Sequence, residues 1–121
     1  MLGWKVFGNG LPGLIVQALC QDAQTSLTAS GTTQGTALEL VNETSDVTTV
    51  ASGAGVVLSS KLTPGDTQYV FNAGANSLKV YPPSGMKINS LATDASMTLG
   101  TSTGCLYKCV STTRVMAVLS A

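Results

Sequence analysis

Residues 64–83 read PGDTQYVFNAGANSLKVYPP, and this stretch decides which fold we expect. Pro64-Gly65 is the proline-glycine pair of a type II turn. The runs Thr67–Asn72 and Ser77–Tyr81 both alternate along the chain, and Gly74 between them tolerates a turn with positive φ. Pro82-Pro83 ends the second run, because proline has no N–H to donate to a sheet. The stretch therefore predicts two short strands joined by a turn.

Further short runs of the same kind surround this stretch. Each is bounded by clusters of Gly, Ser or Thr, which gives turn signals roughly every eight to twelve residues, as in β-sandwiches. No convincing helix follows residue 30, and helical crossovers have no room. The sequence therefore predicts an all-β fold, an antiparallel β-sandwich or jelly-roll-like small barrel of about eight or nine short strands, with Tyr69 and Phe71 anchoring the core. The other expected strands are Ala37–Asn42, Val47–Ala51, Val56–Leu58, Met86–Asn89, Ala95–Leu99, Gly104–Val110 and Arg114–Ser120.

Composition excludes several classes of function. The chain has 121 residues, which suits one domain, and only 10% of them are charged, with a net charge of zero. It contains no histidine, so Ser-His-Asp and Cys-His catalysis and histidine metal sites are excluded. Six basic residues give no electrostatic footprint for nucleic acid or for an anionic membrane. We therefore predict no catalytic residue, no cofactor and no metal, and a surface that sits against a protein partner.

The three cysteines, Cys20, Cys105 and Cys109, do not form a disulfide framework because their number is odd. Cys105 and Cys109 fall in one predicted strand, which places their Cα atoms roughly 13 Å apart, beyond the range of a disulfide. We expect three free thiols, with Cys105 and Cys109 as small apolar residues on one strand face.

Two groups of polar residues are candidates for a functional site. Glu39, Glu43 and Asp46 are the one carboxylate cluster, and a solvated turn explains them better than acid–base catalysis or calcium binding. Tyr81 with Asn76 is the one candidate for an aromatic platform that would bind a sugar.

Residues 1–36 are predicted to be an N-terminal arm and linker, and residues 37–121 a β-sandwich domain. Residues 23–36 are polar and punctuated by glycine, as in linkers. Residues 12–22 fit either a short helix or an extended apolar strand. The arm carries more hydrophobic surface than a solvated tail holds, so we expect it to bind a partner. The proposed partner-binding residues are Trp4, Phe7, Leu11, Leu14, Ile15, Val16 and Leu19.

Charge is divided unevenly along the chain. Residues 1–66 contain two basic and five acidic residues, a net charge of −3, and residues 67–121 contain four basic and one acidic, a net charge of +3. In a sandwich whose halves interleave, this division averages out. The alternative is that complementary edges meet between neighbouring subunits.

Three segments, Gly31–Leu38, Val47–Leu58 and Val70–Pro82, resemble small β-rich virion proteins of tailed bacteriophages. The resemblance covers roughly residues 31–121. It implies a capsid decoration or cement protein, typically oligomeric, bound outside an icosahedral head. The expected partners are the major capsid protein and, as a homotrimer, the protein itself. The resemblance also leaves open a second hypothesis, a host-recognition or carbohydrate-binding module of a tail or head fibre, and a small hydrolase ranks third.

Overall fold

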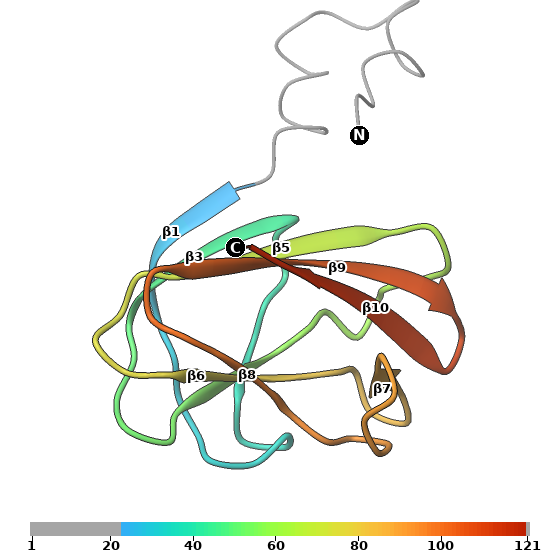
Figure 1. Ribbon diagram of the computed structural model, residues 1–121, viewed down its shortest axis with the longest axis horizontal. Coiled ribbons are helices and arrows are strands. Elements are labelled where there is room, and N and C mark those ends of the chain that lie inside the picture. Colours follow the sequence, from blue (N-terminus) through green and yellow to red (C-terminus); the bar gives the residue numbers. More distant parts are fainter. Residues whose placement is uncertain (1–22, 121) are drawn as a thin grey trace, which may run out of the picture.

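Alternation of apolar and polar residues along short runs produces an all-β fold. The computed structural model describes residues 23–120. In that part of the chain there are ten strands and no helix (Figure 1). The strands are β1 (Ala23–Thr28), β2 (Leu38–Glu39), β3 (Thr44–Thr49), β4 (Gly55–Val57), β5 (Thr67–Asn72), β6 (Leu78–Tyr81), β7 (Lys87–Ile88), β8 (Met97–Leu99), β9 (Thr103–Ser111) and β10 (Arg114–Leu119).

The strands form two facing sheets. One has six strands in the order β1-β3-β5-β9-β10-β7, and the other has four in the order β2-β4-β6-β8. Figure 1 shows β1, β3, β5, β9 and β10 in an upper layer and β6 and β8 in a lower layer, with β7 below β10 on the right. All nine strands expected from the sequence overlap an observed strand, so the all-β prediction is confirmed.

The first six strands wind as a β-solenoid. Successive strands alternate between the sheets, so that β1, β3 and β5 lie side by side and parallel, as do β2, β4 and β6. The register aligns Ala23 with Thr44 and Thr44 with Tyr69 in one sheet. In the other sheet Leu38 aligns with Val56, which aligns with Val80.

The last four strands close this coil. β8 runs antiparallel to β6, β9 to β5 and β10 to β9, and β7 pairs with β10 in parallel. Five of the eight pairings are parallel, so the expected antiparallel sandwich or jelly-roll-like barrel is wrong in its topology. A parallel connection needs a crossover of a dozen or more residues. Here a strand of the opposite sheet, and not a helix, fills each crossover of the coil.

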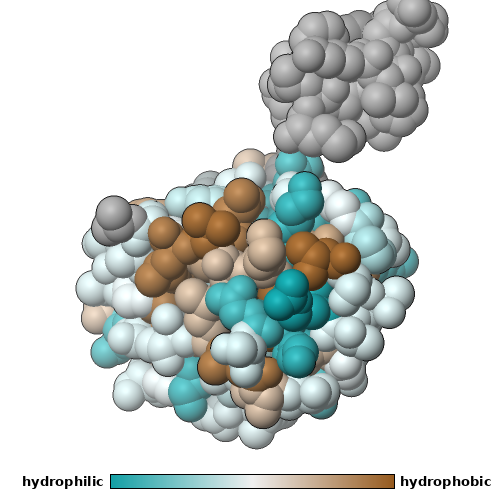
Figure 2. Space-filling view, turned by 45° about the vertical axis from the view of Figure 1, so that its right-hand side comes forward, coloured by the Kyte–Doolittle hydropathy of each residue, from teal (hydrophilic) through white to brown (hydrophobic). Residues whose placement is uncertain are grey.

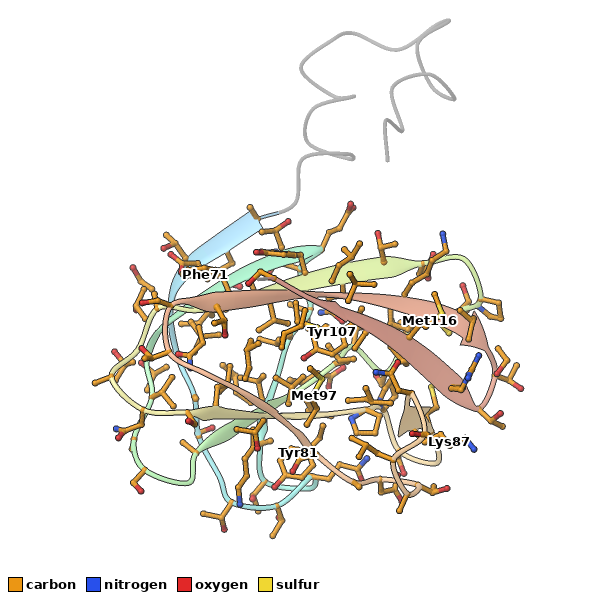
Figure 3. The ribbon with its side chains drawn as sticks, in the orientation of Figure 1. Phe71, Tyr81, Lys87, Met97, Tyr107 and Met116 are labelled. Carbon is orange, nitrogen blue, oxygen red and sulfur yellow. The ribbon has the colours of Figure 1, made fainter. Side chains whose placement is uncertain are left out.

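The core fills the space between the sheets. Tyr107 of β9 is fully buried there, and its hydroxyl lies 3.7 Å from the sulfur of Met97 on β8 (Figure 3). Around it pack mainly β-branched and leucine side chains, which suit pleated surfaces. The fully buried members are Val47, Val56, Leu58, Val70, Leu78, Val80, Ile88, Leu99, Cys105, Cys109 and Val115.

β5 faces the core with the side opposite to the one predicted. Gln68, Val70 and Asn72 are buried, whereas Tyr69 and Phe71 are half-buried on the outer side. The prediction that Tyr69 and Phe71 anchor the core is therefore wrong. Hydrogen bonds to both buried amides offset the free-energy cost of removing them from water. Tyr69 and Phe71 therefore lie on the outer side of the sheet.

Gly65 and Gly74, both predicted to lie in turns, are required for different reasons. Asp66 N–H donates to Thr63 O at 2.9 Å across Pro64-Gly65, and Gly65 has φ of +98°, which confirms the type II turn. Gly74 does not have positive φ. A Cβ atom there would lie 2.6 Å from a methyl carbon of Val50, so close packing is what requires glycine at this position.

Residues 23–36, expected to be a linker, contribute directly to the fold. They include β1, and Ala29 is 5% exposed within the core. The sheet structure of the described chain thus begins at Ala23 and not at residue 37. The seven apolar arm residues proposed to bind a partner (Trp4, Phe7, Leu11, Leu14, Ile15, Val16 and Leu19) lie outside the described residues, as does Cys20.

Candidate interaction surfaces

The outer side of the six-stranded sheet carries a row of apolar side chains. Tyr69 on β5 aligns with Leu106 on β9, which aligns with Val118 on β10, so these three side chains are neighbours across three strands. Leu106 is 41% exposed and Val118 60% exposed. Met116, two residues from Val118, is 42% exposed on the same side. We call Tyr69, Phe71, Leu106, Met116 and Val118 the outer apolar face.

Gly104 completes this face by having no side chain. A Cβ atom on Gly104 would lie 1.8 Å from the hydroxyl oxygen of Tyr69 and 3.1 Å from a ring carbon of Phe71. The two aromatic rings therefore lie over the backbone of β9 at Gly104. Because of this close approach, the two rings form a continuous surface with Leu106, which lies two residues after Gly104 on β9.

Hydrophobic side chains gather visibly on the exterior. Figure 2 shows a brown band across the upper half of the molecule, next to a group of teal, hydrophilic side chains. An exposed apolar group of neighbouring residues, unlike scattered single ones, is typical of a surface that binds another macromolecule.

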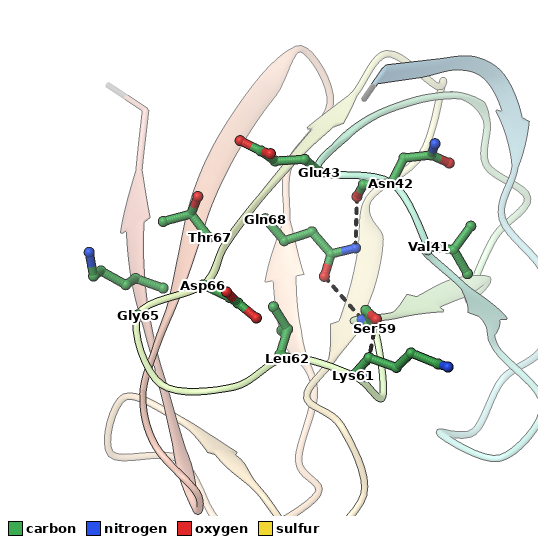
Figure 4. Close-up of a pocket in the computed structure, with 11 residues that line it drawn as sticks. Val41, Asn42, Glu43, Ser59, Lys61, Leu62, Gly65, Asp66, Thr67 and Gln68 are labelled. Atoms are coloured by element: carbon green, nitrogen blue, oxygen red, sulfur yellow. Dashed lines mark hydrogen bonds between the residues drawn. The ribbon is translucent and has the colours of Figure 1, made fainter. Parts of the chain in front are cut away.

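A polar groove of about 570 Å³ lies at the end of the sheets where β5 begins (Figure 4). The buried amide of Gln68 forms its floor. Gln68 Nε2 donates to Leu40 O at 2.8 Å and to Asn42 O at 3.0 Å, and its Oε1 accepts from Ser59 N–H at 3.0 Å. The remaining lining residues are Val41, Glu43, Lys61, Leu62, Gly65, Asp66, Thr67 and Lys108.

The groove is lined by both acidic and basic side chains, and one of the acidic side chains stabilises a turn. The Asp66 carboxylate accepts hydrogen bonds from the N–H and the hydroxyl of Thr63, both at 3.0 Å, and so stabilises the turn. Lys61 and Lys108 also line the groove, together with Glu43. This arrangement offers hydrogen bonds and balanced charge to a ligand, and no aromatic surface.

The three carboxylates that cluster in the sequence do not share one strand: Glu43 precedes β3, and the other two lie in strands. Glu39 lies on β2, where the N–H and the hydroxyl of Ser60 donate to its carboxylate at 3.0 and 2.9 Å. The backbone hydrogen bond from Ser60, followed by the hydroxyl bond, lowers the pKa of the Glu39 carboxyl. Asp46, expected in a solvated turn, instead lies on β3, and its carboxylate accepts a hydrogen bond from Thr25 Oγ1 at 2.8 Å. Glu39 and Asp46 thus belong to different sheets.

The cysteine prediction is confirmed for the two described cysteines. Cys105 and Cys109 are both free and buried on the inner face of β9. Removal from water raises the pKa of both thiols, because burial disfavours the thiolate. Nucleophilic chemistry uses the thiolate, so these two residues serve packing.

The predicted sugar-binding pair is engaged in the fold. Tyr81 is 7% exposed, and its hydroxyl donates to Thr32 O at 3.0 Å. Its ring lies against Gly55, where a Cβ atom would be 2.9 Å from a ring carbon. Asn76 Nδ2 donates to Val50 O at 2.8 Å. Tyr81 and Asn76 therefore do not form an open platform.

The outer apolar face is the surface that sequence reasoning missed. Its signal was the alternation in Gly104–Val110: once Cys105 and Cys109 are assigned to the inner face, Leu106 must point outward. The same period in β10 places Met116 and Val118 outward, opposite the buried Val115.

No family model, curated protein or solved structure matches this chain. Among the described residues there is no group of three or more Cys, Asp or Glu side chains placed to hold a metal ion. The same part of the chain contains no helix long and apolar enough to cross a membrane.

Proposed function

We propose that this protein is a structural virion protein that binds the outside of an icosahedral phage head and stabilises it by bridging neighbouring capsomers. Its partners in this proposal are the major capsid protein and further copies of itself, as a homotrimer. It acts without catalysis and without a cofactor, and the virion assembles in the cytoplasm of a bacterial host.

The observation that carries the proposal is the outer apolar face. In it Tyr69, Leu106 and Val118 align across three strands of a protein in which only 10% of residues are charged and the net charge is zero. Such a surface favours burial against protein, because each Å² of apolar area removed from water contributes roughly 25 cal/mol. The assignment to a phage head follows from the resemblance of Gly31–Leu38, Val47–Leu58 and Val70–Pro82 to small virion proteins.

Because the contacts are repeated over a shell, individually weak contacts are sufficient for tight overall binding. A subunit that touches two capsomers binds the second one as an intramolecular event, which raises the overall affinity without any new kind of contact. An apolar face on a protein with little charge suits repeated protein contacts better than it suits the recognition of one charged ligand.

The alternative, a carbohydrate-binding module of a tail or head fibre, has less support from the described residues. Sugar-binding modules need an exposed aromatic platform flanked by polar side chains, and both Tyr81 and Asn76 are committed to internal hydrogen bonds. The groove at Gln68 is polar and contains no aromatic residue among those that line it.

Sedimentation with bare phage heads tests the proposal. We expect the wild-type protein to co-sediment with heads to a saturating ratio and to raise their resistance to heat. The double variant Leu14→Asp/Ile15→Asp should keep its far-ultraviolet circular dichroism and lose binding, since the apolar arm is proposed to make partner contacts.

Val41→Asp is the matched control. Val41 is 69% exposed and lies outside the strands, so a new charge there should change neither folding nor head binding. Full occupancy of heads by the Leu14→Asp/Ile15→Asp variant, or a wild-type protein that stays in the supernatant, would contradict the proposal.

A further inference from the structure

Charge is polarised across the six-stranded sheet. Within its strands the one carboxylate is Asp46 on β3, near the β1 edge. The cations are Lys108 on β9, Arg114 on β10 and Lys87 on β7, toward the opposite edge. The division of charge seen in the sequence therefore does not average out on this sheet: it becomes an acidic side and a basic side.

The N-terminal segment joins the sheet at its acidic edge. The chain enters β1 at Ala23, and β1 is an edge strand. Residues 1–22 include the seven apolar residues proposed to bind a partner and two charged residues, Lys5 and Asp22. Successive registers align Ala23 with Thr44, Tyr69, Leu106 and Val118. The point of attachment thus lies in the same row as the outer apolar face.

We propose that the outer apolar face binds the N-terminal segment, residues 1–22, of a second copy of this chain, with the acidic β1–β3 side of one copy beside the basic β10–β7 side of the other. This inference rests on the self-association in the proposed function and names the surface that performs it. The contact is heterologous, joining different surfaces of the two copies, so repeating it around a rotation axis closes a ring.

The charge polarity favours a second copy over the same chain as the source of the segment. Within one chain, the outer apolar face extends from β5, two strands from β1, to β10, which is four strands or about 19 Å away at the usual strand spacing of about 4.8 Å. In the proposed arrangement, the basic side of a neighbouring copy adjoins β1. Only the neighbour's two-residue strand β7 then lies between β1 and the neighbour's β10. Opposite charges on the two sides orient the copies in this way before the apolar surfaces meet.

Trp4 provides the probe, because it is the single tryptophan of the chain and belongs to the segment. In the full-length protein without phage heads, we expect Trp4 fluorescence to be blue-shifted and protected from acrylamide. Val118→Asp should shift the emission to the red and increase quenching, because an aspartate in the middle of the face opposes apolar contact. Leu106→Asp should act in the same direction, and Val41→Asp should leave the emission unchanged.

A mixing experiment identifies which chain supplies the segment. One partner is Val118→Asp, which has an intact segment with Trp4 and a defective face. The other is Trp4→Phe/Leu14→Asp/Ile15→Asp, which has an intact face and no tryptophan. In an equimolar mixture we expect the Trp4 emission to return toward the blue, with a dimer or larger species in sedimentation velocity. Added salt should weaken this recovery, because it screens the complementary sides.

Two results would overturn the inference. One is a Trp4 emission that does not respond to Val118→Asp or responds equally to Val41→Asp. The other is a wild-type emission that is blue-shifted but independent of protein concentration, with a monomer in sedimentation velocity, which assigns the face to the segment of the same chain. Because no heads are present, either result leaves the head-binding experiment independent. Conversely, recovery on mixing together with absent head binding would keep this interface and reject the phage role.

Discussion

Gln68 and Asn72, four residues apart on β5, both point their amide side chains between the two sheets and are hydrogen-bonded there through nitrogen and oxygen. Gln68 joins β5 to the segments that follow β2 and β4, through Leu40, Asn42 and Ser59. Asn72 Nδ2 donates to Leu99 O at 3.0 Å and to Asn76 O at 2.9 Å, and its Oδ1 accepts from Gly74 N–H at 2.9 Å. The two amides thus connect the layers at both ends of one strand.

Gln68→Leu should lower the free energy of unfolding by about 2–3 kcal/mol, because two backbone carbonyls and one N–H lose a partner at buried or part-buried positions. Urea unfolding followed by circular dichroism measures this change. The matched control is Gln24→Leu on the exposed strand β1, which should change stability by less than about 0.5 kcal/mol. Equal effects of the two substitutions would show that the amide contacts of Gln68 contribute nothing.

Gly74→Ala should lower stability by about 1–3 kcal/mol, since the new methyl group overlaps Val50 and the structure must shift. The backbone nitrogen of Val50 would be 2.9 Å from that Cβ, so a rotamer change of Val50 does not relieve the contact. Gly35→Ala is the control, because no atom lies within 4 Å of a Cβ built there. Thermal unfolding of both variants should rank Gly74→Ala clearly below wild type and Gly35→Ala beside it.

Cys105 and Cys109 should resist thiol reagents until the protein unfolds, because both are fully buried. In Cys20→Ser, titration with a thiol reagent should count no reactive thiol in native buffer and two in denaturant. Two rapidly reacting thiols in the native protein would show that β9 opens on the timescale of the reagent.

Stability should fall as the pH rises above about 9. The inner face of β9 buries three groups that ionise at alkaline pH, and burial raises the pKa of Cys105, Cys109 and Tyr107 above ordinary values of 9, 9 and 10. Between the ordinary and the raised pKa, the unfolded chain has lost protons that the native state keeps. The unfolded state then binds fewer protons, so the free energy of unfolding decreases with pH.

Urea midpoints at pH 7, 9 and 10.5 measure this dependence, and they should decrease in that order. Tyr107→Phe should be less stable at pH 7, having lost the contact of the hydroxyl with Met97, and should show a shallower decrease at alkaline pH. A midpoint that rises with pH would contradict the assignment of these groups as buried and protonated.

Sequence patterns predicted where most strands lie but not how they pair. The bounds of β5 and the buried cysteine face of β9 follow directly from period-two alternation. Parallel and antiparallel strands share that period, so alternation contains no information about the coil of β1 to β6. β1 was missed because its sequence, Ala-Gln-Thr-Ser-Leu-Thr, is mostly exposed and polar, and its place depends on pairing with β3.

The orientation of β5 shows a second limit. Its alternation is satisfied with either Tyr69 and Phe71 or Gln68, Val70 and Asn72 toward the core, and hydrophobicity favours the aromatic pair. The partners that satisfy Gln68 and Asn72 come from residues up to 28 positions away. Such long-range compensation is invisible to a local pattern, and it also determines that the outer apolar face is on the surface.

The parallel coil has a consequence for synthesis of the chain. Its first six strands are complete once Tyr81 has been made, but β5 and β6 then expose open backbone edges that only the later strands β9 and β8 pair. β7 is made before β10, its one partner among the described strands. A growing chain therefore presents unpaired edges until β10 has left the ribosome, and crowded nascent chains would pair through them. The native six-stranded sheet is finished only after β10 has emerged.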